Sequence, residues 1–373
     1  MPWRVSSIMS ARQEFVLLAS RPEVNRRALC RRFGISAATA YKWLERYQNE
    51  GVSGLADRSR QPRHSPRKTA PLIEDAVLCL RRKHPAWGGR KLRQRLLDLG
   101  QQQVPSASTI NAILKRNQMI DAAEAAKHQA FLRFEHEAPN DLWQMDFKGD
   151  FVVGRGRCYP FTILDDHSRF ALAVLACPKI STELARSLLT TVFRRYGLPR
   201  RITCDNGPPW GAGNSKYTRL GVWLLQLGIA VSHSRPYHPQ TQGKDERFHR
   251  TLQAEVLRYL ELDDLTLCQA RFEQWRQVYN TERPHEALGL KVPACRYQPS
   301  PRTYPERLPA IEYGPNDIVR KVKGYGHIKY QNREYHIGSA FAGLAVALRF
   351  TTTDGLFDVY FCQIRIGQIN LTA

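Results

Sequence analysis

The hydrophobic pattern changes twice along the chain, and these changes constrain the fold more than any other feature. Up to residue 137, apolar residues recur at the three- and four-residue spacing of amphipathic helices. From residue 142, strand-like runs alternate with helical ones, and beyond residue 316 only short strands and turns remain. The 373 residues suffice for two to four domains with cores of their own. The sequence therefore predicts several domains of different class.

The predicted architecture is an all-α N-terminal region of helix-turn-helix units, a central α/β mixed sheet with helices on both faces, and a small C-terminal β-barrel. Basic or Pro-rich segments without periodicity mark the linkers. The expected parts are a helix-turn-helix domain (1–54), a basic linker (55–70), a second helix-turn-helix-like domain (71–137), the mixed-sheet core (138–296), a Pro-rich linker (297–316) and the barrel (317–373).

Positive charge is concentrated in the first third. The formal net charge is +22, and residues 1–137 carry 25 basic against 12 acidic side chains. Such a basic end favours a polyanionic partner, most often nucleic acid, because a general solubility charge would not cluster. The sequence has no apolar run of membrane-span length and no signal-peptide core. The eight cysteines form no CxxC pair, which favours reduced thiols in a cytosolic compartment.

Residues 25–49 have the pattern of a helix-turn-helix. Gly34 supplies the turn, and Ser36 can cap the second helix. The solvent face of that helix is expected to contact DNA. An ordinary three-helix bundle with a solvated basic face is the alternative. The candidate contacts are Thr39, Lys42 and Arg46.

A second helical unit follows the basic linker. Its third helix is predicted over residues 106–118, with Ser106 or Ser108 as the cap. Lys115 and Arg116 in its last turn are further candidate DNA contacts, and cations there also suit the helix dipole. Residues 122–136 are expected to form a connecting helix.

The central region predicts three consecutive strands and then alternating helices and strands. Such an order indicates a mixed sheet. The expected strands are 142–153, 158–165, 170–177, 201–204 and 229–232, and the expected helices are 181–196, 217–227, 242–260 and 265–279.

Three acidic residues have the context of a site. Asp146 lies in an apolar strand, where a carboxylate is unfavourable without a cation or hydrogen-bond partner. Asp205 closes a strand, and strand ends are where sites collect. Glu246 lies near the start of a helix, off its core face. Three carboxylates from separate elements suit Mg²⁺ or Mn²⁺ rather than zinc. Two such ions, roughly 4 Å apart, would serve an in-line phosphodiester displacement.

The role of several other residues can be interpreted in two ways. Asp165 and Asp166 have the pattern of turn residues, with support of the site as the alternative. Asp150 and Asp245 are competing acids near the candidate triad. The histidines His233, His238 and His249 match no zinc spacing. Trp210 and Tyr237 can stack on bases, although core packing is the commoner role of aromatic residues.

Polar side chains around Glu246 are candidates for contact with phosphates. A lysine two residues before the acid suits the orientation of a scissile phosphate. A solvated helix start is the alternative. The candidates are Gln240, Gln242, Lys244 and Arg250.

Four segments together, WQMDFKGDF, LDDHSRF, TCDNG and RPYHPQTQGKDERFHRTL, resemble the catalytic core of bacterial insertion-sequence transposases. These enzymes are related to retroviral integrases and belong to the DDE, RNase H-like polynucleotidyl transferases. CRRFGISAATAYKWL also resembles the N-terminal helix-turn-helix of that group.

The resemblance implies an RNase H-like core in which Asp146, Asp205 and Glu246 are the catalytic, metal-binding triad. It also implies two Mg²⁺ (or Mn²⁺) ions, cleavage at transposon ends and transfer of the 3′-hydroxyl into double-stranded target DNA. A homo-oligomer assembled on DNA in the bacterial cytoplasm, associated with the nucleoid, is expected. The alternatives are a DNA-binding repressor whose core has lost activity and a nuclease that cuts without joining.

Overall fold

The computed structural model describes residues 7–58, 69–120, 135–211, 217–233, 243–259 and 264–371. It divides the chain into two units, Met1–Lys68 and Thr69–Ala373. The connecting helix expected over residues 122–136 lies almost entirely outside the described residues. In the described ranges, no helix has the length and apolar character needed to cross a membrane.

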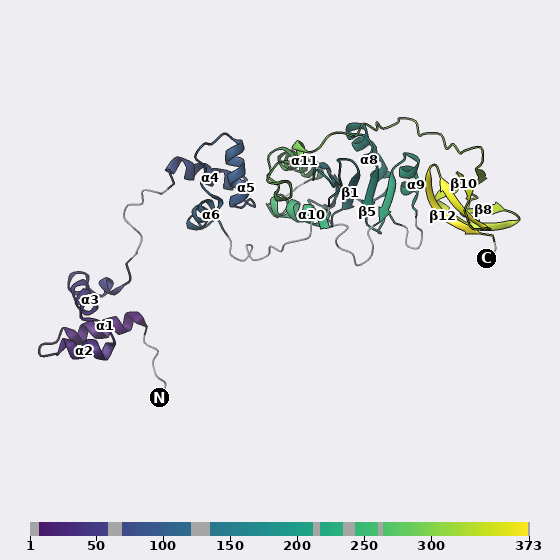
Figure 1. The fold of residues 1–373 in the computed structure, drawn as a ribbon. Coiled ribbons are helices and arrows are strands. Elements are labelled where there is room, and N and C mark those ends of the chain that lie inside the picture. Colours follow the sequence, from purple (N-terminus) through teal and green to yellow (C-terminus); the bar gives the residue numbers. More distant parts are fainter. Residues whose placement is uncertain are drawn as a thin grey trace. The chain divides into compact units, whose positions relative to one another are not determined.

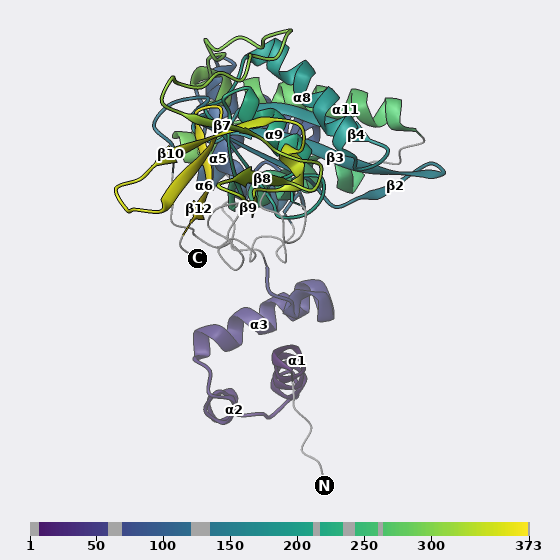
Figure 2. The same cartoon turned by 90° about the vertical axis from the view of Figure 1, so that its right-hand side faces the viewer.

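Three helices make up the first unit, and Figure 2 shows α3 running across the axis of α1. The helices are α1 (Ile8–Ala19), α2 (Arg26–Phe33) and α3 (Ala37–Glu50), followed by the 3-10 helix η1 (Gly51–Leu55). Gly34 ends α2 with a left-handed φ of 63°, and the Ser36 side chain caps α3 by accepting from the Thr39 amide at 3.2 Å. The predicted turn and cap are therefore confirmed.

Helix α1 was not predicted from the sequence. It contributes Phe15, Val16 and Ala19 to the core of the first unit, where they meet Leu44 and Trp43 of α3. Its pattern is weak because the apolar residues Ile8 and Leu17 are exposed, so the helix has no clear polar side. The first unit therefore depends on three helices for its core rather than on the helix-turn-helix pair alone.

The second unit begins with three more helices. They are α4 (Pro71–Lys83), α5 (Gly89–Asp98) and α6 (Ala107–Arg116). Ser106, not Ser108, caps α6 by accepting from the Thr109 amide at 3.2 Å. Ile110, Ile113 and Leu114 of α6 are buried, as helical spacing predicts, and they pack in one core with Trp87.

A six-stranded mixed sheet follows (Figure 1). Its strands are β1 (Leu142–Phe147), β2 (Phe151–Val153), β3 (Gly156–Asp165), β4 (Ala171–Cys177), β5 (Arg201–Cys204) and β6 (Ala230–His233). The order is β2-β3-β1-β5-β6, with β4 paired to β3. Strand β1 lies at the centre, antiparallel to β3 and parallel to β5, and β5 is parallel to β6. The mixed sheet is confirmed.

The strand expected over residues 142–153 is two strands, which corrects the prediction. The chain bends at residues 148–150, because β1 pairs with the far half of β3 and β2 pairs with its beginning. The Lys148 amide donates to the carbonyl of Pro160 at 2.9 Å across this bend. The bend falls on the polar segment 148–150, which separates two apolar halves.

Helices cover both faces of the sheet (Figure 1). One face packs against α8 (Thr182–Tyr196) and α9 (Arg219–Gln226), and the other packs against α10 (Gly243–Glu255) and α11 (Leu265–Thr281). The predicted helix 242–260 is shorter than expected, because a 3-10 turn, Leu257–Tyr259, follows α10. The two faces have separate hydrophobic cores, so each helix pair holds its own side of the sheet.

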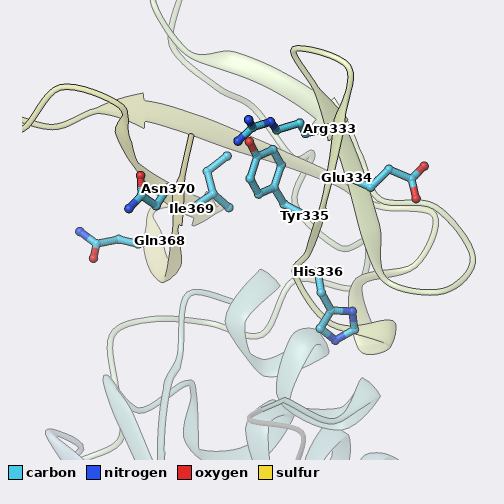
Figure 3. Close-up of a pocket in the computed structure, with 7 residues that line it drawn as sticks. All are labelled: Arg333, Glu334, Tyr335, His336, Gln368, Ile369 and Asn370. Carbon is cyan, nitrogen blue, oxygen red and sulfur yellow. The ribbon is translucent and has the colours of Figure 1, made fainter. Parts of the chain in front are cut away.

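The C-terminal strands form open sheets, and the expected closed β-barrel is not confirmed. Four strands form one antiparallel sheet, β7 (Ile318–Lys321), β10 (Ala345–Phe350), β11 (Leu356–Phe361) and β12 (Ile364–Asn370), and two form a hairpin, β8 (His327–Tyr330) and β9 (Arg333–His336). Closure would require β12 to pair with a further strand, and β9 instead stands apart from it. A hollow lined by β9 and residues 368–370 separates them (Figure 3).

Truncation of Leu252 on α10 should weaken the fold strongly. Its side chain is fully buried in the core between α10, α11 and the sheet, so Leu252→Ala should lower the free energy of unfolding by about 2–5 kcal/mol. Urea denaturation of the full chain measures this loss. Gln253→Ala is the matched control, because the neighbouring side chain is exposed, and it should change stability by less than about 0.5 kcal/mol. Equal effects of the two variants would contradict the packing of α10.

Candidate active site

Parallel pairing of β1 and β5 brings two of the predicted acids to the same edge of the sheet. The register pairs Gln144 with Thr203. Asp146 and Asp205 each lie two residues further along their strands, at the carboxyl ends. Because neighbouring parallel strands run about 4.8 Å apart, the two residues lie side by side. Two of the three predicted triad residues therefore meet.

The alternation of side chains decides which face Asp146 occupies. Its neighbour Met145 lies in the core under α8 and α9, as does Ile202 of β5. Successive side chains of a strand point to opposite faces, so Asp146 points to the side that α10 and α11 cover. Thr162, paired with Asp146 across β1 and β3, lies on the same side.

The pKa values of both carboxyl groups are raised. Burial, and then the charge of Asp205, raises the pKa of Asp146 from 3.8 to about 7. Burial also raises the pKa of Asp205, although the Gly207 amide, which donates to its Oδ1 at 3.2 Å, and the charge of His233 oppose the shift. Ionising both acids is unfavourable without a nearby cation. Strongly shifted acids paired at a strand end are typical of functional sites.

Helix α10 presents its first turn and His249 to this pair. The His249 Nε2 lies 2.8 Å from the Thr162 hydroxyl, and its Nδ1 lies 3.9 Å from Oδ2 of Asp146. Burial lowers the pKa of His249 to about 4, so the ring is neutral near pH 7. The spacing of the histidines in the sequence matches no zinc motif, and it does not predict the contact of His249 with Thr162 and Asp146. That contact depends on how α10 lies over β1 and β3.

Glu246 is exposed on α10, whereas the preceding residue, Asp245, is 2 % exposed. Both residues are neighbours of His249 on the helix surface, at three and four positions before it. Burial, followed by the charges of Asp146 and Asp166, raises the pKa of Asp245 well above its usual value. Within the described ranges, no three His, Cys, Asp or Glu side chains converge closely enough to hold a metal ion. The structure thus brings Asp146 and Asp205 together, and it leaves Glu246 exposed on α10.

The donor chemistry of the site nevertheless suits a divalent cation. Neither carboxylate oxygen of Asp245 has a hydrogen-bond partner among the described residues, although both are buried. Buried carboxylates without partners are unfavourable unless a proton or a cation offsets the charge. Carboxylate oxygens are also the ligands that Mg²⁺ and Mn²⁺ prefer.

The turn between β3 and β4 contains two buried acids with different roles. Asp165 holds the turn: its Oδ2 accepts from the Ser168 amide at 2.8 Å, and its Oδ1 accepts from the Asn140 amide at 2.8 Å. Asp166 faces α10 instead, and Lys244 forms an ion pair with its Oδ2 at 2.5 Å. Asp165 thus has the predicted turn chemistry, and Lys244, expected at a phosphate, is engaged inside the protein.

The remaining candidates around the triad have different placements. Arg250 is exposed on α10, and Asp150 is paired at the surface with Arg157. Trp210 is 3 % exposed and stacks on Phe147, which resolves its two readings in favour of core packing. Gln240, Gln242, Tyr237 and His238 lie outside the described residues.

Cationic side chains from α1 and α3 gather over a buried tryptophan, Trp43. Cationic groups of three residues lie over the Trp43 ring: Arg12 at 4.0 Å, Arg46 at 5.0 Å and Lys42 at 5.1 Å from the ring centroid. Lys42 is exposed, and Thr39 and Arg46 are half-buried. This basic face therefore has an exposed lysine that can extend toward a ligand, and arginine side chains that are ordered against the tryptophan ring.

Helices α4 to α6 present a smaller basic face. Lys115 is exposed at the end of α6, and Arg116 forms an ion pair with Glu74 of α4 at 2.7 Å. Of the two predicted contacts, Arg116 is thus already paired within the protein.

Comparisons with known families match each part of the chain. Residues 136–239 and 227–293 match integrase core domains, and residues 317–373 match the C-terminal domain of the IS481 family transposases. Residues 11–63 match a helix-turn-helix domain, and residues 39–114 match a homeodomain-like domain.

Individual relatives point the same way. The chain is 27% identical over 157 residues to the uncharacterised 31.7 kDa protein of insertion element IS407 from Burkholderia multivorans, covering 42% of this chain and 55% of that protein. It is 28% identical over 165 residues to the 39.2 kDa protein of IS476 from Xanthomonas euvesicatoria, covering 44% of this chain and 46% of that protein. The chain thus spans about half the length of these curated relatives.

Among solved structures, the catalytic core domain of the HTLV-2 integrase in complex with magnesium is similar to 38% of this chain, over 88% of its own length, with 19% identity and a TM-score of 0.31. The matched domains and the insertion-element relatives instead support a bacterial insertion-sequence transposase with an integrase-type core.

Proposed function

We propose that the chain binds the ends of its own insertion element and catalyses phosphodiester cleavage there, followed by transfer of the 3′-hydroxyl into double-stranded target DNA. The observation that carries the proposal is the pairing of Asp146 and Asp205 at the carboxyl edge of β1 and β5, with the pKa of Asp146 raised to about 7. A repressor needs no such pair of half-buried acids. The reaction would take place in the bacterial cytoplasm, on nucleoid DNA, within a homo-oligomer.

Asp146, Asp205 and Glu246 would hold the metal in this proposal. Glu246 is the third acid because it lies three residues before His249, whose ring is 3.9 Å from the Asp146 carboxylate. Its exposed carboxylate stays accessible to an ion and to DNA. Two bound Mg²⁺ or Mn²⁺ ions would activate a water or a 3′-hydroxyl and offset the charge of the departing oxygen.

The neighbouring residues orient the acids. The neutral His249 ring lies between Thr162 and Asp146, so it limits the directions in which the Asp146 carboxylate can turn. The Gly207 amide holds one oxygen of Asp205. Gln240, Lys115, Arg116 and Arg250 remain candidate DNA contacts, together with Thr39, Lys42 and Arg46 of the first unit.

Asp205→Asn should abolish strand transfer while leaving binding to terminal DNA nearly intact. The change removes the charge that a divalent ion requires but keeps the size of the side chain and the fold around β5. An in vitro joining reaction with labelled end DNA, with and without Mg²⁺, measures the loss, and a gel-shift assay measures binding. The same reaction separates cutting from joining, and so distinguishes a transposase from a nuclease.

Two further variants sharpen this test. Glu246→Gln should lose joining as Asp205→Asn does, whereas Asp150→Asn should retain it, because Asp150 pairs with Arg157 at the surface. Joining by the Asp205→Asn or the Glu246→Gln variant would refute the assignment of the triad.

Asp146→Asn should stabilise the metal-free chain more at pH 8 than at pH 5. The pKa of Asp146 is about 7 in the folded chain against 3.8 for the unperturbed group, so the folded state resists ionisation and loses stability as pH rises between these values. The variant escapes that loss, and its gain should be larger at pH 8 by on the order of 2–3 kcal/mol. Urea denaturation at both pH values measures it. A gain that does not change with pH would contradict the raised pKa of Asp146.

Lys42→Ala should weaken binding to DNA of any sequence and reduce its salt dependence. Each lysine that contacts a phosphate releases about one counterion, so the slope of log affinity against log salt should fall by about one. Titrations of end DNA and of unrelated DNA at several salt concentrations give the slopes. Gln48→Ala, an exposed and uncharged position on the same helix, is the matched control. An unchanged slope for Lys42→Ala would remove α3 from the DNA interface.

A further inference from the structure

Asp166 is a buried carboxylate that receives donors from three separate parts of the chain. It is 1 % exposed. Its Oδ1 accepts from Nε2 of Gln144 on β1 at 2.8 Å, and its Oδ2 accepts from the His136 amide at 2.9 Å. The ammonium of Lys244, on the first turn of α10, lies 2.5 Å from the same Oδ2. The side chain of Lys244 is 18% exposed, so the ion pair is largely shielded from water.

The pair lies among other charges. Arg169 is the other cation near Asp166, at 3.9 Å, and the buried carboxyl of Asp245 follows Lys244 directly in the chain. Lys244 therefore supplies the nearer positive charge to a region where the carboxylates of Asp146, Asp166 and Asp245 repel one another. A buried ion pair is strongly destabilised when only one partner is removed, because the other charge is left uncompensated.

The ion pair joins the two elements that carry the proposed metal ligands. Gln144 lies two residues before Asp146 on β1, and Lys244 lies two residues before Glu246 on α10. The contacts thus run from β1 through Gln144, Asp166 and Lys244 to α10. Successive residues of a helix lie about 100° apart around its axis, so even a partial rotation of α10 would change the direction in which Glu246 projects.

We propose that Lys244 and Asp166 are positioning residues, which together set the rotation and depth of α10 and thereby the place of Glu246 beside Asp146 and Asp205. This inference rests on the proposed function. It assigns Lys244 to the interior of the protein, although its place two residues before an acid also suits a phosphate contact. The two roles differ in a measurable way, since a phosphate contact has no effect when DNA is absent.

The test is Mn²⁺ binding to the full chain without DNA, measured by isothermal titration calorimetry. Lys244→Met removes a positive charge near the site, so a purely electrostatic role would tighten Mn²⁺ binding. A positioning role predicts the opposite, a loss of about tenfold or more, because Glu246 leaves its place. The double variant Lys244→Met/Asp166→Asn leaves neither charge of the pair without its partner, but it also lacks the contact that holds α10, so it should bind Mn²⁺ as weakly as Lys244→Met.

Arg247→Met is the matched control, an exposed cation on the same helix, and should leave Mn²⁺ affinity within about twofold of the natural chain. Thermal unfolding of each variant reports whether it folds. If Lys244→Met does not fold, the double variant carries the same test, because it leaves neither Lys244 nor Asp166 as an unpaired buried charge.

The outcomes separate this inference from the proposed function. Unchanged or tighter Mn²⁺ binding by Lys244→Met overturns the positioning role, and so does a double variant that recovers the affinity of the natural chain, because the loss would then come from an unpaired buried charge. Absence of Mn²⁺ binding by the natural chain itself would instead refute the metal site on which both proposals rest.

Discussion

The parallel pairing of β1 with β5 is the constraint on which the rest of the second unit depends. It joins residues about sixty positions apart in sequence, and it requires the intervening strands and α8 to return the chain across one face of the sheet. Once that register exists, Asp146 and Asp205 necessarily share one edge. The hydrophobic core beneath α8 and α9 supplies the free energy that holds two like charges together.

The opposite face of the sheet has to satisfy two conflicting demands. Helix α10 must bury Phe248 and Leu252 to cover the sheet, and the same packing brings acidic groups out of water. The structure meets both demands by placing apolar residues along one stripe of the helix and a lysine at its first turn, opposite Asp166. In this one helix, the burial of apolar side chains stabilises the fold, while the burial of acidic groups opposes it. The orientation of α10 therefore depends on the charges around it.

Short-range sequence patterns predict most of the helices and strands of this fold. An apolar strand interrupted by Asp146, a strand closed by Asp205 and a helix turned by Gly34 are short-range patterns, and the expected elements follow them closely. The ion pair of Lys244 with Asp166 was not predictable, because its partners are 78 residues apart and depend on how α10 docks. Sheet closure at the C-terminus is likewise a property of strand pairing, which local alternation does not encode.

The cations gathered over Trp43 affect the entropy of recognition. Long basic side chains normally lose rotamer freedom when they reach a charged partner, at about 0.5–1.5 kcal/mol for each chain that becomes fixed. Arg12 and Arg46 already lie against a rigid indole ring in the free protein. Part of their ordering is therefore completed during folding, and the first unit presents a partly immobilised cationic surface before any ligand arrives.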